Sequence, residues 1–162
     1  AIGDFTVAEN LLLLDHGEEP YSRRGVLQLG TIQRHCRELV ARFKVKTPDT
    51  STPISSLSGG NIQKVIMARE LFGAPGVVLA AQPTRGVDIG AAEYIHERLV
   101  AQRDAGAAIL LISEDLDEVM ALSDRIAVMF EGRIMGVVDS DTATPAELGL
   151  LMAGVTGEQH TT

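Results

Sequence analysis

Apolar residues follow the spacing of helices in the front third of the chain and that of short strands further on. Two amphipathic helices are predicted at the front, one over residues 7–14 and one beginning at Thr31. Asp4 or Thr6 is the expected cap of the first helix, with Thr6 and Glu9 in the spacing of a capping box, and Thr31 is the expected cap of the second. A polar stretch with glycine and proline predicts an exposed loop over residues 16–30.

The rest of the chain alternates between amphipathic helices and short apolar runs. Continuous apolar strands between helices are typical of a parallel sheet that is covered on both faces, and Glu131-Gly132 favours an antiparallel hairpin near the end. The predicted fold class is therefore α/β, with a mainly parallel sheet and a helical subdomain at the front. The expected strands are residues 77–81, 108–112, 125–130 and 133–138, and the expected helices are residues 59–72, 89–103, 116–122 and 145–152.

Composition and charge narrow the classes of function. The chain has 162 residues, 45% of them hydrophobic, and a formal net charge of -8. This negative charge disfavours nucleic acid and anionic lipid as partners, because binding either of them requires cationic side chains against phosphates. The four histidines and the single Cys36 show no metal-ligand spacing, and no apolar run reaches the roughly 18 to 20 residues that cross a bilayer. We therefore expect no metal site and no nucleic-acid partner.

The residues with the most specific chemistry are Ser58, Gly59, Gly60 and Asn61. Ser58 stands at the cap position of a predicted helix, and the two glycines allow another surface to approach the backbone closely. Free N–H groups at such a helix start, at the positive end of the helix dipole, form an anion site. A capped helix with a simple glycine turn is the alternative interpretation of these four residues.

The order of the segments after this helix resembles the second half of ABC ATPase domains. A signature-like motif, Leu57-Ser58-Gly59-Gly60-Asn61, is followed by an apolar strand, by Pro83-Thr84, and by a second strand that leads into Ser113-Glu114. The resemblance covers nearly the whole chain. Asn61, together with Arg85-Gly86-Val87-Asp88, is similar to the second domain of the fused double-ATPase subunits of importers for simple sugars and nucleosides.

The resemblance implies a role in ATP-driven import. ABC ATPase domains pair head to tail, so that each ATP lies between the P-loop of one domain and the signature of the other. ATP and Mg²⁺ are thus the expected cofactors of the full-length dimer, and neither is expected to bind tightly to this chain alone. The residues expected to contact ATP in trans are Ser58, Gly59, Gly60, Asn61 and Asp88.

The resemblance also implies the partners and the location of the full-length protein. The expected partners are a P-loop-bearing ATPase domain fused upstream, transmembrane permease subunits and, indirectly, a substrate-binding protein. The expected location is the cytoplasmic face of the cell membrane, as a peripheral protein. The three expected parts of this chain are a helical subdomain ending in the signature helix (residues 1–74), the Walker B, D-loop and switch part of the α/β core (residues 75–140), and a C-terminal helix with a tail (residues 141–162).

Three positions depart from the family pattern. Members carry an Asp and then a Glu at the end of the Walker B strand, and a His at the switch, where this chain has Ala81, Gln82 and Glu114. Alanine offers no oxygen to Mg²⁺, a glutamine amide cannot accept a proton as a carboxylate does, and a glutamate repels phosphate. No G-x-x-x-x-G-K-[ST] sequence occurs. We therefore expect a fragment that lacks the Walker A half, has a degenerate site of its own and is inactive in isolation.

Two other functions stay open at this point. ATPase heads of chromosome-maintenance and DNA-repair proteins share the signature and Walker B layout, but they carry a long coiled coil before the signature. The approach to Ser58 contains prolines and no heptads, which disfavours that class. The other alternative is a nucleotide-free scaffold domain that keeps only the ABC shape.

Overall fold

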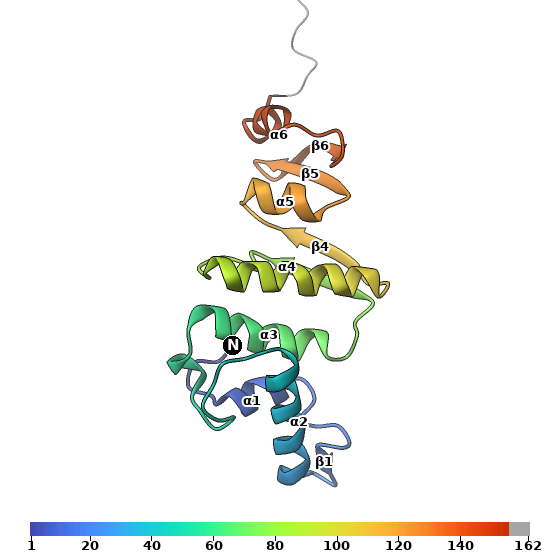
Figure 1. The fold of residues 1–162 in the computed structure, drawn as a ribbon. Coiled ribbons are helices and arrows are strands. Elements are labelled where there is room, and N and C mark those ends of the chain that lie inside the picture. Colours follow the sequence, from blue (N-terminus) through green and yellow to red (C-terminus); the bar gives the residue numbers. More distant parts are fainter. Residues whose placement is uncertain (156–162) are drawn as a thin grey trace, which may run out of the picture. The chain divides into compact units, whose positions relative to one another are not determined.

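The computed structural model describes residues 1–155, which divide into two compact units (Figure 1). The first unit comprises residues 1–78 and 83–109, and the second comprises residues 79–82 and those from 110 onward. This mixture of helices and strands, with helices at the front, confirms the predicted α/β class; the predicted polar tail, residues 157–162, lies outside the described residues. The elements are α1 (Val7–Leu12), β1 (Ser22–Arg23), β2 (Val26–Leu27), α2 (Leu29–Arg42), η1 (Ile54–Ser56), α3 (Gly59–Leu71), β3 (Val77–Ala81), α4 (Ile89–Asp104), β4 (Ala108–Ile112), α5 (Leu116–Leu122), β5 (Arg125–Phe130), β6 (Arg133–Asp139) and α6 (Pro145–Met152).

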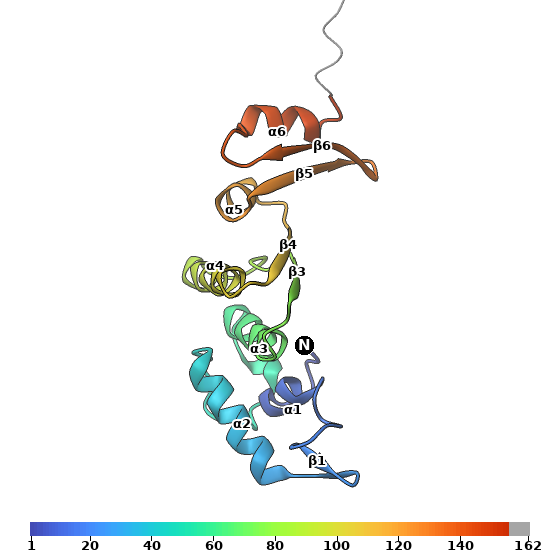
Figure 2. The same cartoon turned by 90° about the vertical axis from the view of Figure 1, so that its right-hand side faces the viewer.

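Helices α1, α2 and α3 enclose the core of the first unit. Helix α1 contacts both α2 and α3, as Figure 2 shows from the side. Thr6 caps α1: the Glu9 N–H donates to Thr6 Oγ1 at 3.2 Å, and the Thr6 N–H donates to Glu9 Oε2 at 2.7 Å. The predicted capping box is thus confirmed. The largest fully buried apolar side chains of this unit are Val7, Leu11, Leu39, Ile54, Val65 and Ile95.

Two predictions for the front of the chain were wrong. Helix α2 begins at Leu29, so Thr31 lies in its first turn and not at the cap. The predicted loop over residues 16–30 contains an antiparallel pair, β1 and β2, joined by Arg24 and Gly25 with φ of 53° and 78°. Positive φ at both central residues is the geometry of a two-residue hairpin turn. An arginine is an uncommon residue there, so Gly25 was the turn signal in this stretch, and it was interpreted as part of a longer loop.

Strands β3 and β4 form a parallel pair, as predicted for these two runs. The Ala108 N–H donates to Gly76 O at 2.9 Å, and further along the Gln82 N–H donates to Ile112 O at 2.7 Å. These strands form a sheet of only two in the described part of the chain. The prediction that both faces of this sheet are covered was wrong, because apolar side chains of both strands are exposed. Their apolar pattern suits a larger sheet. The apolar side chains left exposed on β3 and β4 are Val77, Leu79, Leu110 and Ile112.

The second unit contains the hairpin of β5 and β6, with α6 packed against it (Figure 1). The strands are antiparallel and turn at Glu131 and Gly132, with φ of 46° and 77°, so the predicted hairpin is confirmed. Ile126, Val128 and Leu148 form the buried core of this unit. Helices α5 and α6 have the predicted bounds.

Leu148 is the fully buried leucine of α6 in the core of the second unit. Leu150 on the same helix is 56% exposed. We expect Leu148→Ala to lower the free energy of unfolding by about 2–5 kcal/mol, because it leaves a cavity, and Leu150→Ala to change it by less than about 1 kcal/mol. Urea denaturation of the two variants measures this difference. Equal effects of the two substitutions would contradict the packing described here.

Candidate nucleotide-contact site

The start of α3 leaves backbone donors free. Ser58 stands at the cap position with extended φ and ψ of -65° and 154°, as predicted. Its hydroxyl does not cap the helix, however; Ser58 Oγ accepts a hydrogen bond from Asn61 Nδ2 at 2.9 Å. The N–H groups of Gly59 and Gly60 have no acceptor within residues 1–155. Two free donors at the positive end of a helix of this length suit an anion.

Asn61 ties this helix start to the loop before it. Its amide donates to Ser58 Oγ, and its Oδ1 accepts from the backbone N–H of Lys46 at 2.8 Å. Both ends of the amide are therefore used within the protein. Asn61 orients Ser58 and is held in turn by the backbone at Lys46, so its side chain acts through Ser58 and has little freedom to bind a ligand itself.

The two glycines allow α3 to approach the segment around Asp88 closely. A Cβ atom added to Gly60 would lie 2.7 Å from Ala91 Cβ, and one added to Gly59 would lie 3.2 Å from Gly86 O. Real Cβ atoms essentially never show a non-bonded contact as short as the first distance, and the second is tighter than most of their contacts. Glycine at these two positions is therefore a consequence of packing against the start of α4, as well as a means of exposing the backbone.

Asp88 stands at the start of α4 and near the start of α3. Its Oδ1 accepts from the Ala91 N–H at 2.8 Å, which makes it the cap of α4. Helices α3 and α4 lie side by side in both views (Figures 1 and 2), and Figure 1 shows that they run in the same direction, so their first residues lie together. The structure thus brings Ser58, Gly59, Gly60, Asn61 and Asp88 into one group within the first unit.

Ala81, Gln82 and Glu114 lie together in the second unit, at the ends of β3 and β4. The hydrogen bond from the Gln82 N–H to Ile112 O holds the two strand ends side by side. Gln82 has a φ of 49°, an uncommon left-handed backbone for glutamine. Ala81 carries no oxygen, and Gln82 carries a neutral amide. Glu114 is therefore the one carboxylate among these three residues, and the two positions at the end of β3 offer none to Mg²⁺, which prefers carboxylate and phosphate oxygens.

Residues 1–155 contain no group of three or more His, Cys, Asp or Glu side chains that could hold a metal ion. His160 lies outside this range. In the same described range, no helix combines the length and the apolar character that crossing a membrane requires.

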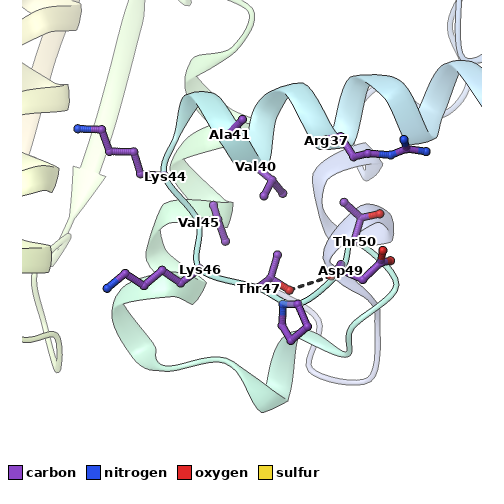
Figure 3. Close-up of a pocket in the computed structure, with 10 residues that line it drawn as sticks. Arg37, Val40, Ala41, Lys44, Val45, Lys46, Thr47, Asp49 and Thr50 are labelled. Atoms are coloured by element: carbon purple, nitrogen blue, oxygen red, sulfur yellow. Dashed lines mark hydrogen bonds between the residues drawn. The ribbon is translucent and has the colours of Figure 1, made fainter.

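A hollow of about 450 Å³ lies between the end of α2 and the loop that supports Asn61 (Figure 3). Val40 and Val45 line its middle, while the side chains of Lys44 and Lys46 point away from it. The hydroxyl of Thr47 donates to Asp49 O at 2.8 Å, so it stabilises the loop itself. The two lysines therefore do not bring positive charge into the hollow, and we assign no ligand to it.

Sequence reasoning missed three residues that support the start of α3. Lys46 acts through its backbone, which no sequence pattern reveals. Lys64 and Tyr94 are in contact: Lys64 Nζ lies 4.8 Å from the centroid of the Tyr94 ring. No pattern in the sequence pairs Lys64 with Tyr94, because the two residues belong to different helices.

Comparison with known proteins gives a consistent group of sequence relatives, although no family model matches the chain. The chain is 51% identical over 156 residues to the guanosine import ATP-binding protein NupO of Bacillus subtilis. This alignment covers 96% of this chain and 31% of that protein. It is 48% identical to the nucleoside import ATP-binding protein NupA of Lactococcus lactis (93% of this chain, 30% of that protein). It is 40% identical to the glucose import ATP-binding protein TsgD13 of Haloferax volcanii (94% and 28%). The chain thus spans less than a third of the length of these relatives.

Solved structures share its fold. The ATP-binding subunit of an ABC transporter superimposes with a TM-score of 0.71 at 22% identity, over 94% of this chain and 64% of that one. A dimeric ATP-binding cassette in a post-hydrolysis state, bound to ADP and Pi, gives a TM-score of 0.67 at 22% identity, over 86% and 58%. The chain therefore has the fold of a large part of an ABC ATPase domain, and its sequence relatives are ATP-binding proteins for nucleoside and sugar import.

Proposed function

We propose that this chain is a segment of the ATP-binding subunit of an ABC importer for nucleosides or simple sugars. It corresponds to the C-terminal, degenerate ATPase domain of a double-domain subunit, without the Walker A half. Its role is to supply the signature motif to an ATP held by a partner domain. The similarity to three import ATP-binding proteins supports the transport role, and the length of those relatives leaves room for a P-loop domain upstream.

The observation that carries this proposal is the exposed start of α3. Ser58 and Gly59 are exposed, and the N–H groups of Gly59 and Gly60 are free among the described residues. The hydroxyl of Ser58 and these N–H groups donate to the terminal phosphate of an ATP presented from outside the chain. Asp88 stands beside them and accepts hydrogen bonds from the partner domain across the same interface. Because no P-loop occurs in this chain, the phosphate has to come with the partner.

The chain's own phosphate site is the part that we propose to be inactive. With Ala81 and Gln82 at the end of β3 there is no metal-binding carboxylate and no general base, and the exposed Glu114 adds a negative charge near where phosphate would lie. The two ATP sites of such a pair are thus unequal. Hydrolysis takes place at the site completed by Ser58 and Asp88, with the partner's own P-loop and Mg²⁺.

The remaining assignments follow from this role. Residues 1–74 form the helical subdomain, residues 75–140 carry the Walker B, D-loop and switch positions, and residues 141–162 form the C-terminal helix and tail. The full-length subunit binds ATP and Mg²⁺, contacts transmembrane permease subunits and works with a substrate-binding protein. It is located as a peripheral protein on the cytoplasmic face of the membrane.

The purified chain alone is expected to show no ATP hydrolysis and no micromolar affinity for ATP, because it carries a signature motif but no P-loop to hold the nucleotide. Calorimetric titration with ATP and Mg²⁺ tests this. Addition of a separately purified P-loop domain from the same full-length subunit should restore ATP-dependent association, seen as a shift in sedimentation. A scaffold without nucleotide function would show no such shift, and micromolar ATP binding by the chain alone would contradict the proposal.

A further inference from the structure

Helices α3 and α4 touch at a second place beyond the glycine contact. The Lys64 ammonium of α3 lies 4.8 Å from the centroid of the Tyr94 ring, and the Arg98 guanidinium carbon lies 5.2 Å from the same centroid. Tyr94 is only 7% exposed. A cation within about 6 Å of a buried aromatic face is attracted by the ring quadrupole, more strongly than at an exposed site. Tyr94 is thus held by two cations, one from each helix.

The ring, and not the hydroxyl, makes these contacts. Within the described residues, Tyr94 Oη is buried and has no hydrogen-bond partner. Burial raises the pKa of Tyr94, which Arg98 partly opposes, so the phenol stays neutral at physiological pH. A buried hydroxyl without a partner costs stability. The contacts of the ring, and not those of the hydroxyl, therefore stabilise Tyr94 between the two helices.

Together the two contacts fix how α3 lies on α4. At Gly60 and Ala91 the helices meet closely, which sets their separation. That contact involves a glycine and a methyl group, so it offers nothing that holds the helices in register. Lys64 and Tyr94 lie about one turn further along, and a directional contact there prevents α3 from sliding or turning on α4.

We propose that Tyr94 is a positioning residue: its ring, held by Lys64 and Arg98, sets the place of the Ser58–Asn61 helix start relative to Asp88. This inference rests on the proposed function, because the helix start and Asp88 are the two parts that would meet the partner domain and its ATP together. A loosened α3 would present its donors in many positions, so more ATP would be needed to close the interface. The effect therefore falls on the KM for ATP, and kcat at saturation is preserved.

The test measures ATP hydrolysis by the full-length subunit in its assembled transporter. Lys64→Met and Tyr94→Leu are expected to raise the KM for ATP about 2- to 30-fold, the range of a cation–π contact, with kcat within about twofold of the unmodified protein. Lys64→Arg retains a cation and Tyr94→Phe retains a ring, so each should have the KM for ATP of the unmodified protein. The matched control is Lys44→Met, which removes an exposed lysine far from Tyr94 in sequence and should change neither parameter.

Several results would overturn the inference. An unchanged KM in Lys64→Met, or a Tyr94→Phe variant that behaves like Tyr94→Leu, contradicts a role for the cation and the ring. If Tyr94→Leu fails to fold, the KM values for ATP of Lys64→Met and Lys64→Arg decide the question, because Lys64 is only half-buried and its replacement disturbs packing less. Gly59→Asp is measured alongside. Normal hydrolysis by Gly59→Asp would contradict the proposed function itself, whereas an inactive Gly59→Asp with an unaltered Lys64→Met would contradict only the positioning role.

Discussion

Replacement of Gly59 by aspartate is expected to reduce ATP-driven uptake by the reconstituted full-length transporter at least about 100-fold. The new carboxylate would stand at the free N–H groups of α3, where the partner's ATP phosphate is proposed to bind. Two unit charges about 4 Å apart repel by about 4 kcal/mol at an effective dielectric constant of about 20, equivalent to roughly a thousandfold in an equilibrium. Uptake of labelled solute into proteoliposomes measures the effect.

The packing of Gly59 requires a control for size as well as for charge. A Cβ atom at this position would lie 3.2 Å from Gly86 O, so any side chain strains the contact somewhat. Gly59→Asn has nearly the size of the aspartate variant without its charge and should retain far more uptake. Gly73→Asp, at a position with nothing within 4 Å, should behave as the unmodified protein. Equal loss in the asparagine and aspartate variants would mean that crowding, and not repulsion of phosphate, is the cause.

Gly60→Ala is expected to destabilise the first unit by about 1–3 kcal/mol, the usual cost of overpacking. The added methyl group would lie 2.7 Å from Ala91 Cβ, so α3 would have to move away from α4. A methyl group normally favours a helix by about 1 kcal/mol relative to glycine, so a loss of stability would reverse the intrinsic preference. Denaturant unfolding of the chain measures it, with Gly73→Ala as the control in open space.

A second substitution identifies the clash as the cause. Ala91→Gly removes the atom that the new methyl group would meet, at a helix-propensity cost of about 1 kcal/mol of its own. If the clash is real, the double variant should be more stable than the sum of the two single effects predicts, by about 1 kcal/mol or more. Additive effects would show that the helices do not meet at these two positions.

Local structure could be predicted where a short segment contains its own explanation. The capping box of Thr6 and Glu9, the turn at Glu131 and Gly132, and the bounds of α5 and α6 all follow from residues that lie next to one another. The helix start at Ser58 was predicted in the same way, because glycines after a serine are a local signal.

Features that depend on distant segments could not be read from the sequence. Helix α2 begins after Gln28, which makes no side-chain cap hydrogen bond, so no capping residue marked its start. The hairpin at Arg24 depends on a backbone geometry that arginine rarely adopts. The apolar face of β3 and β4 was expected to be covered, but it is exposed. The residue pattern of a strand indicates whether its faces are apolar, and it does not show how many strands lie beside it. The contact of Lys64 with Tyr94 joins residues that are 30 positions apart, which periodicity within one helix cannot reveal.

The hydrogen bond from Lys46 to Asn61 has a consequence for how this protein varies in evolution. The donor is the backbone N–H at position 46, and the lysine side chain points elsewhere. Nineteen of the genetically encoded amino acids carry that N–H, and only proline lacks it. Selection on the helix start therefore constrains the backbone path of the loop and leaves the side chain at position 46 free to vary. Substitutions other than proline at position 46 can accumulate as neutral changes beside a functional motif.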